Sequence, residues 1–341
     1  MSLISDILPF HSLSIVGMAK NTGKTVCLNY VLDQLRHTDK VLAVTSIGID
    51  GEKQDQVTQT EKPEVTLYEG MFFVTSEYHY RQRQLISEIY DVRGEMTSMG
   101  RLVIARVLQE GKAILAGPAS SMRMKALIDR MHSLGGDMFI VDGALSRRSP
   151  AAPSITDGLI LSTGAAIAPD IPTIVEKTKF VYQMTELPAY DTLFHDDLLR
   201  ADTGIFAIEN EQIFQLPIAS PLLIAKSKEK LFTHGSTLFI SGILTDSILE
   251  HLRTQPQIKD TILIVKDFTK IFVTPYVLNS YRQRGGQLFV LQKPNLTAIC
   301  INPTSPLGVR VDSAALQEAL QKVVHIPVYD IRRLQPDIMT K

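Results

Sequence analysis

Residue types that bind phosphate and Mg²⁺ occur together near the start of the chain. In the segment IVGMAKNTGKT, Gly17 and Gly23 enclose five residues, and Lys24 and Thr25 follow directly. Glycines leave backbone N–H groups open to an anion, a lysine ammonium can reach the β- and γ-phosphates of a nucleotide, and a threonine hydroxyl can bind Mg²⁺. The usual phosphate-binding loop has four residues between its glycines, so this loop is one residue longer.

We predict that this loop binds ATP, with Lys24 as a catalytic cation. The binding residues are predicted to be Gly17, Lys20, Asn21, Thr22, Gly23, Lys24 and Thr25. An apolar run at 12–16 precedes the loop and a helix is predicted at 23–36, so the phosphates would meet a helix N-terminus. Lys20 is either a second phosphate contact or a solvated loop charge.

Mg²⁺ takes one or two protein oxygens beside the phosphates, and acidic residues follow two of the apolar runs. Asp142 comes directly after the run at 138–141. We predict that it binds Mg²⁺ together with Thr25 and takes part in catalysis, and the competing interpretation is that it caps a turn. Asp50, Glu52 and Asp55 lie in a loop after the run at 41–46, and these residues either assist the metal or form a solvated acidic loop.

Other reactive residue types form no catalytic pattern. The eight histidines lack the spacings typical of a metal site, and no Gly-x-Ser-x-Gly motif occurs. The two cysteines, Cys27 and Cys300, are far apart in the sequence. We therefore expect no tightly held transition metal, no hydrolase triad and no disulfide framework.

An alternation of strands and helices must position these residues. Strands are predicted near 12–16, 41–46, 72–75, 113–116, 138–141 and 158–161, with helices at 23–36, 80–90, 100–109, 120–133 and 171–184. This order is typical of an α/β fold, and with the phosphate loop it predicts a P-loop NTPase parallel sheet with helices on both faces. Because the carboxyl ends of parallel strands share one edge, the loop and Asp142 should meet there.

The alternation loosens between 186 and 221, where prolines and a short hairpin, IFAIENEQIFQL, intervene. We therefore predict a nucleotide-binding domain at 1–187, a linker and hairpin region at 188–220, and a second, smaller α/β domain at 221–341. The strands of the second domain are predicted in STLFISG, TILIVKD, QLFVLQK, LTAICIN and IPVYDI, with a helix at 313–323.

The composition of the chain limits the classes of partner and the cellular compartment that we expect. The chain has 341 residues, 35 Lys and Arg against 36 Asp and Glu, and a net charge of -1, which predicts no nucleic-acid partner from bulk charge. No eighteen apolar residues run uninterrupted, which predicts no membrane span. The amino-terminal segment lacks Lys and Arg before its apolar residues, so with only two cysteines a cytoplasmic protein is expected.

The segment GMAKNTGKT resembles the loop of dethiobiotin synthetase and its relatives, P-loop proteins that also have five residues between the glycines. In that branch an acidic residue after the second strand assists the metal, and the resemblance therefore implies Asp50 as a Mg²⁺ ligand. Lys20 lies four residues before Lys24. It does not match the extra signature lysine of the related MinD-type ATPases, which lies five residues before the loop lysine.

Motifs from most of the chain resemble the B subunit of the lysine 5,6-aminomutase reactivase: VGMAKNTGKT, TSIGIDGEKQD, AGPASS, VDGALSRRS, LILSTGAA, SGILTDSIL and INPTSPLG. The resemblance implies the ATP-binding component of a chaperone for an adenosylcobalamin-dependent aminomutase. With a mismatch-repair-ATPase-like second subunit, it would couple ATP hydrolysis to the release of damaged cofactor. Ile49 departs from this family, where a basic residue is expected.

Two alternatives remain open at the level of the sequence. The first is an ATP-dependent ligase or kinase that resembles dethiobiotin synthetase and acts on a small substrate. The second is a loop that binds nucleotide only structurally. A homodimer is compatible with each of these functions.

Overall fold

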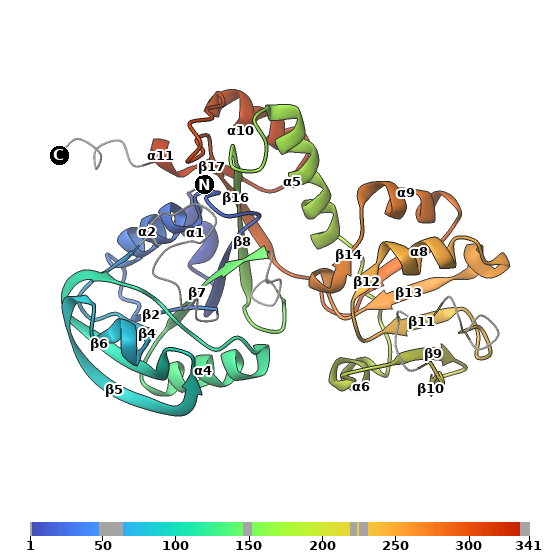
Figure 1. Ribbon diagram of the computed structural model, residues 1–341, viewed down its shortest axis with the longest axis horizontal. Coiled ribbons are helices and arrows are strands. Elements are labelled where there is room, and N and C mark those ends of the chain that lie inside the picture. Colours follow the sequence, from blue (N-terminus) through green and yellow to red (C-terminus); the bar gives the residue numbers. More distant parts are fainter. Residues whose placement is uncertain (1, 48–63, 146–151, 219–223, 225–230, 335–341) are drawn as a thin grey trace. The chain divides into compact units, whose positions relative to one another are not determined.

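The computed structural model describes the chain except residues 1, 48–63, 146–151, 219–223, 225–230 and 335–341 (Figure 1). The chain divides into two compact units. Unit 1 consists of Met1–Lys179 together with Asn295–Lys341, and unit 2 consists of Phe180–Pro294.

Unit 1 is built on a mostly parallel ten-stranded sheet with the strand order β17-β16-β8-β1-β7-β2-β4-β6-β3, and β5 pairs with β6 outside this path. Neighbouring strands from β17 to β4 are parallel. These strands are β1 (Ser12–Gly17), β2 (Leu42–Ser46), β4 (Phe72–Ser76), β7 (Met138–Ala144), β8 (Gly158–Gly164), β16 (Leu296–Asn302) and β17 (Val328–Asp330). The predicted α/β class with a parallel central sheet is therefore confirmed.

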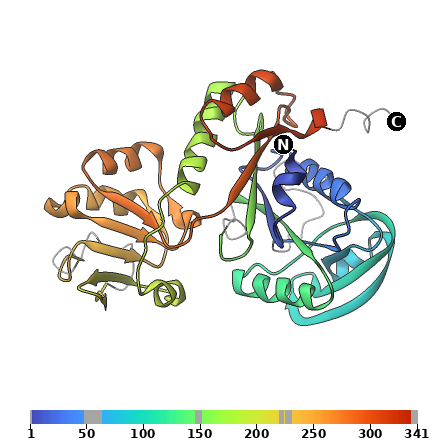
Figure 2. The ribbon, with the colours of Figure 1, turned by 180° about the vertical axis from the view of Figure 1, so that it is seen from behind.

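Two apolar clusters cover the two faces of this sheet because successive strand residues point to opposite sides. Ile140 packs in one cluster with α2 (Lys24–Leu35) and α1 (Leu3–Ile7), whereas Phe139 and Val141 pack in the other with α4 (Ser121–Ser133). Figures 1 and 2 show α2 in blue and α4 in green on opposite sides of the strands. The remaining helices of this unit are α3 (Glu77–Tyr80), α10 (Ser313–Gln321) and α11 (Ile331–Leu334), and α5 (Ile171–Thr185) continues into unit 2.

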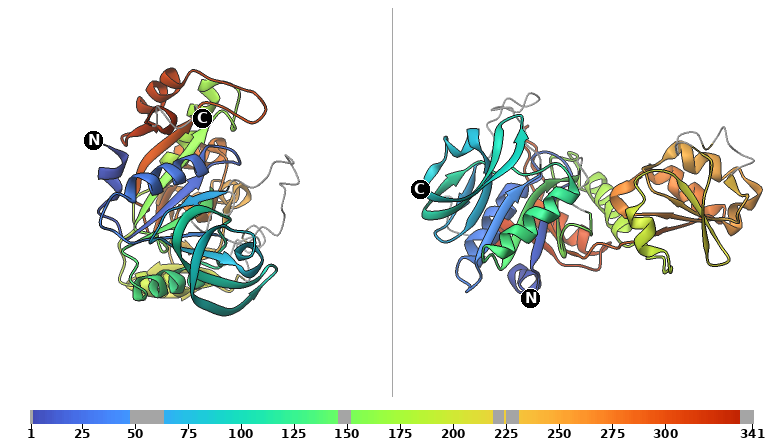
Figure 3. Two further views of the ribbon diagram at one scale, coloured as in Figure 1. Left: turned by 90° about the vertical axis from the view of Figure 1, so that its left-hand side faces the viewer. Right: turned by 90° about the horizontal axis from the view of Figure 1, so that it is seen from below.

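Two predicted helices, at 80–90 and 100–109, are wrong. These residues lie largely in β5 (Gln84–Thr97) and β6 (Gly100–Ala113), two antiparallel strands of fourteen residues each, the cyan and teal hairpin in Figures 1 and 3. β6 also pairs antiparallel with β4 and with β3 (Val65–Leu67). Four consecutive residues of β6, at 102–105, are buried, so this part of the strand shows no alternating pattern to separate it from a buried helix.

The strand predicted at 113–116 is also wrong, because β6 ends at Ala113. The backbone after it still follows the sheet edge, since the N–H of Ala116 donates to the carbonyl of Val74 at 3.0 Å.

The domain boundaries in the structure differ from those predicted. Residues 296–302 form β16, which pairs with β8 of unit 1, so the chain returns to the first sheet after building unit 2. Residues 188–220 are predicted as a linker and hairpin region, and in the structure they contain α6 (His195–Arg200) and the hairpin strands β9 (Ile205–Glu209) and β10 (Gln212–Gln215), all within unit 2. Strand and helix alternate without a break in composition at 295, so local sequence offers no sign of the return.

Unit 2 has a five-stranded sheet with the order β10-β9-β11-β13-β15. The predicted hairpin is confirmed as β9 and β10, and β11, β13 and β15 are parallel. The other elements are β11 (Thr237–Ile240), β12 (Leu244–Thr245), α8 (Asp246–Leu252), η4 (Pro256–Asp260), β13 (Ile262–Val265), η5 (Phe268–Lys270), β14 (Ile271–Phe272), α9 (Pro275–Gln283) and β15 (Gln287–Val290). Within the described ranges of both units, no helix has the length and apolar character needed to cross a bilayer.

Candidate nucleotide site

The glycine-bounded loop connects the central strand β1 to helix α2. β1 is buried along its whole length and pairs with β7 on one side and β8 on the other. Gly17 ends the strand, and a Cβ at this position would lie 2.7 Å from Oγ1 of Thr22, so the closed loop requires glycine there. Gly23 is the N-cap of α2 with φ of 87°, and no side chain caps the helix. The first N–H groups of α2 are therefore not taken by a side-chain cap and can bind an anion.

Hydrogen bonds hold the loop in this closed form. The N–H of Met18 donates to the carbonyl of Ser162 in β8 at 2.9 Å. The buried hydroxyl of Thr22 donates to the carbonyl of Ala19 at 3.0 Å. Thr22 was predicted to contact the nucleotide, and its hydroxyl is engaged within the loop, which leaves its backbone N–H for that role. Asn21 has a positive φ of 64°, and its side chain is exposed, as is that of Lys20.

Lys24 and Asp142 are brought together as predicted from the sheet. Asp142 lies opposite Ile15 in the parallel pairing of β7 with β1. Nζ of Lys24 forms an ion pair with Oδ1 of Asp142 at 2.8 Å, with side-chain exposures of 25% and 14%. Oδ1 is buried, and the Lys24 ammonium is the partner that the described residues give it. A buried carboxylate oxygen whose partner is one flexible lysine is well placed to exchange that lysine for another cation.

Thr25 lies in the first turn of α2, directly after Lys24. Its hydroxyl and the Asp142 carboxylate are the hard oxygen ligands that Mg²⁺ prefers, and phosphates and water would complete the shell. In the described part of the chain, no three His, Cys, Asp or Glu side chains gather as a metal-binding group. The residues present therefore fit an ion that is bound mainly through a nucleotide. Asp50, the other predicted ligand, lies outside the described residues.

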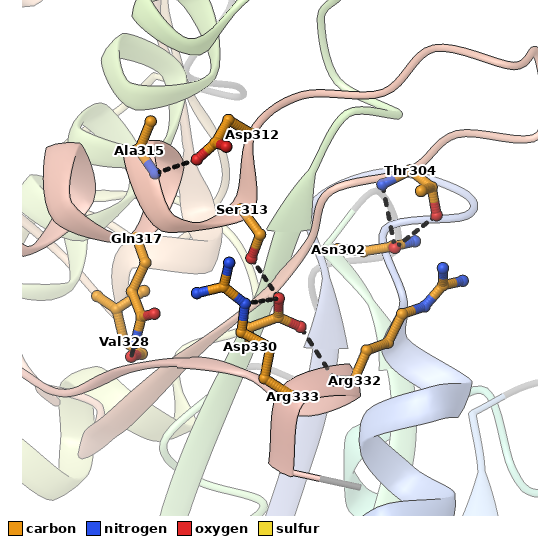
Figure 4. Close-up of polar contacts among 10 residues, drawn as sticks. All are labelled: Asn302, Thr304, Asp312, Ser313, Ala315, Gln317, Val328, Asp330, Arg332 and Arg333. Carbon is orange, nitrogen blue, oxygen red and sulfur yellow. Dashed lines mark hydrogen bonds and ion pairs between the residues drawn. The ribbon is translucent and has the colours of Figure 1, made fainter. Parts of the chain in front are cut away.

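Asn302 is a site residue that sequence reasoning missed. It ends β16, and its Nδ2 donates to the carbonyl of Asn21 at 3.2 Å. Its Oδ1 accepts from the N–H of Thr304 at 3.3 Å and from the Thr304 hydroxyl at 3.1 Å (Figure 4). The signal was a polar residue after an apolar strand in INPTSPLG, but that strand was assigned to the second domain.

Close packing between Gly23 and Asn302 leads to a prediction. A Cβ at residue 23 would lie 2.8 Å from Cβ of Asn302, and the positive φ adds backbone strain. We expect Gly23→Ala to lower the free energy of unfolding by about 1–3 kcal/mol and to weaken nucleotide binding. Urea denaturation checks this result. Gly70→Ala is the matched control, because Gly70 has φ of 84° and nothing within 4 Å of its Cβ position. An equal cost in both variants would show that contact with Asn302 is unimportant.

Comparisons of this chain with protein-family models, with curated proteins and with solved structures return no match. The assignment of this site therefore depends on its own geometry: a glycine-bounded loop, an uncapped helix N-terminus and a lysine–aspartate pair at one sheet edge.

Proposed function

We propose that unit 1 is a P-loop NTPase fold that binds MgATP at the Gly17–Thr25 loop and hydrolyses it. The observation that carries the proposal is the 2.8 Å ion pair between Lys24 of the loop and Asp142 of the neighbouring strand. It joins the phosphate-binding cation and the metal-binding carboxylate at the carboxyl edge of a parallel sheet, where ligands of such folds bind.

Each residue has a defined role in this proposal. The N–H groups at the start of α2 and the Lys24 ammonium bind the β- and γ-phosphates. The Thr25 hydroxyl and the Asp142 carboxylate would hold Mg²⁺, which when bound would neutralise charge on the phosphate oxygens. In the reaction a water oxygen bonds to the γ-phosphorus, the bond to the β–γ bridging oxygen breaks, and ADP and phosphate leave.

The ion pair implies that Lys24 and Asp142 change partners when nucleotide binds. In the structure the ammonium of Lys24 neutralises the partly buried carboxylate of Asp142. When phosphates arrive, Lys24 would turn to them, and a bound Mg²⁺ would balance the charge of the Asp142 carboxylate. Neither charge is left buried without a partner at any stage.

We further propose that the protein acts as the ATP-binding component of a reactivating chaperone for an adenosylcobalamin-dependent aminomutase. The support is the resemblance of seven motifs, from VGMAKNTGKT to INPTSPLG, to the B subunit of the lysine 5,6-aminomutase reactivase. ATP hydrolysis would drive release of damaged cofactor together with a mismatch-repair-ATPase-like subunit. A cytoplasmic location is part of the same proposal.

The chaperone role predicts that partner proteins alter the ATPase. A partner that prefers one nucleotide state must shift nucleotide affinity by the same coupling energy, typically about 1–3 kcal/mol. We expect slow hydrolysis by the protein alone, and a change of about fivefold or more in rate or affinity when the aminomutase or the second reactivase subunit is added. Steady-state ATPase assays and nucleotide titrations with and without each protein measure this.

A ligase or kinase would behave differently in the same assay. Its turnover requires a substrate nucleophile in line with the γ-phosphate, so a small amine or acid should stimulate it. Stimulation by such a molecule, with no response to either protein, would overturn the chaperone proposal and favour a dethiobiotin-synthetase-like enzyme. MgATP binding at the loop would stand in both cases, whereas in the enzyme the substrate would replace water as the group that bonds to the γ-phosphorus.

A further inference from the structure

The segments that follow β16 and β17, at one end of the unit 1 sheet, begin at the same sheet edge as the candidate nucleotide site. β16 and β17 are parallel, and Ile301 lies opposite Asp330 in their pairing. The segments that follow Asn302 and Asp330 therefore leave the sheet at the same edge, about 4.8 Å apart at the strand ends. β16 is in turn joined to the loop strand β1 through β8.

Asp330 fixes the backbone at the exit from β17. Its carboxylate is buried, and it accepts a hydrogen bond from the hydroxyl of Ser313. Its Oδ1 accepts from the N–H of Arg332 at 3.0 Å, and its Oδ2 lies 3.7 Å from Nε of Arg333 (Figure 4). The start of α11 is therefore set by a buried side chain, although the helix itself is short.

Arg332 and Arg333 differ in what their side chains do. The guanidinium of Arg333 pairs with Asp330, whereas that of Arg332 is exposed and makes no hydrogen bond or ion pair with the described residues. In Figure 4 the side chain of Arg332 extends from α11 toward the segment of Asn302 and Thr304. Asn302 is the residue that contacts the phosphate loop at Asn21.

The direction of a bound nucleotide follows from the positions of Lys24 and Asp142. Asp142 belongs to β7, on one side of β1, so the metal and the γ-phosphate lie toward that side. The space on the other side of β1, where β8, β16 and β17 follow in order, is left for the nucleoside. α11 follows β17 and packs in the same apolar cluster as α2 through Ile331. Arg332, the next residue, therefore lies beside α2 on the β17 side of the nucleotide site.

We propose that the guanidinium of Arg332 stacks on the purine base of the bound nucleotide; this inference rests on the proposed function. A guanidinium is planar and weakly hydrated, and it stacks on aromatic faces in a way that a lysine ammonium does not. The Arg332 side chain is available for this contact, and the buried Asp330 holds its backbone in place.

The test compares a ligand that has a base with one that has only phosphates. Wild type, Arg332→Ala, Arg332→Lys and Arg333→Ala are titrated with MgATP and with Mg²⁺-tripolyphosphate. We expect Arg332→Ala to bind MgATP about threefold to thirtyfold more weakly and tripolyphosphate unchanged within about twofold. Arg332→Lys should lose part of the ATP affinity, because lysine keeps the positive charge but lacks the planar guanidinium that stacks on the base. Arg333→Ala is the matched control, since it removes the same charge from the same helix.

Two results would overturn this assignment. Equal loss of affinity for both ligands in Arg332→Ala would make Arg332 a phosphate contact, and unchanged affinity for both would remove it from the site. Lys24→Ala tests the proposed function separately from the role of Arg332. This variant should bind both MgATP and Mg²⁺-tripolyphosphate more weakly than wild type. If wild type binds neither ligand, the proposed function and the role of Arg332 fail together. Thermal unfolding of each variant separates a loss of affinity at the site from a loss of folded protein.

Discussion

Replacing Asp142 by asparagine is expected to lower Mg²⁺-dependent ATP turnover by about 100-fold or more, the scale of losing one electrostatic contact to a reacting group. Asparagine keeps the size and the turn-forming ability of aspartate but loses the charge that holds Mg²⁺. The midpoint of thermal unfolding should stay within about 4 °C of wild type. Stability should hold because the buried run 138–141 is untouched and Asp142 lies at its end.

The matched control for this variant lies at the other end of the same apolar run. Asp137 precedes β7, and its Oδ2 accepts from the N–H of Val41 at 2.8 Å. Asp137→Asn should therefore leave turnover unchanged. If Asp142→Asn instead loses stability while the folded fraction keeps full turnover, Asp142 caps a turn and the metal role is wrong.

Replacing Lys24 by alanine is expected to weaken MgATP binding by about tenfold to 150-fold, the equivalent of about 1.5–3 kcal/mol for a lost charge-assisted contact. The variant loses the cation that reaches the β- and γ-phosphates and leaves Asp142 without its ion-pair partner. Calorimetric titration measures the change. Lys322→Ala is the control, because it removes a lysine whose only described ion pair is the exposed one with Glu318.

Equal ATP affinity in wild type and Lys24→Ala would remove Lys24 from the site. Lys20→Ala, measured beside it, distinguishes the two interpretations of the second loop lysine. A solvated charge should change affinity by less than about twofold, whereas a second phosphate contact should cost about tenfold.

The part of the site predicted from sequence is the part built from local signals. The glycines, Lys24 and Thr25 lie in one strand–loop–helix segment, and the apolar run before Asp142 is long enough to identify a buried strand. The shared edge of parallel strands then brings Lys24 and Asp142 together without further information.

The parts that could not be predicted depend on pairing between distant segments. Cys27 in α2 and Cys300 in β16 were expected in different domains, but their Sγ atoms lie 3.4 Å apart as buried free thiols. The hydrogen bond between the two thiols, together with burial, raises the pKa of the Cys300 thiol well above its usual value. The return of β16 to the first sheet also brings Asn302 to the loop, and no local pattern marks that return.

The β5–β6 hairpin was missed for a different reason. Its strands follow a strand and a short helix, where an alternating α/β pattern favours a helix, and several register shifts interrupt the period of two along β5. Residues such as Val103 and Ile104 point to opposite apolar clusters, so both faces are buried. These β-branched residues favour a strand, but the alternating order of strands and helices led to the prediction of a helix.

The central claim, that the Gly17–Thr25 loop is the nucleotide site, is tested most directly by hydrogen exchange measured by mass spectrometry with and without saturating MgATP. The account predicts slower exchange at the backbone amides of residues 21–25, where the phosphates bind, and in the segment 302–304 that contacts the loop. Protection confined to Phe180–Pro294, or no protection of the loop at saturating MgATP, would contradict it.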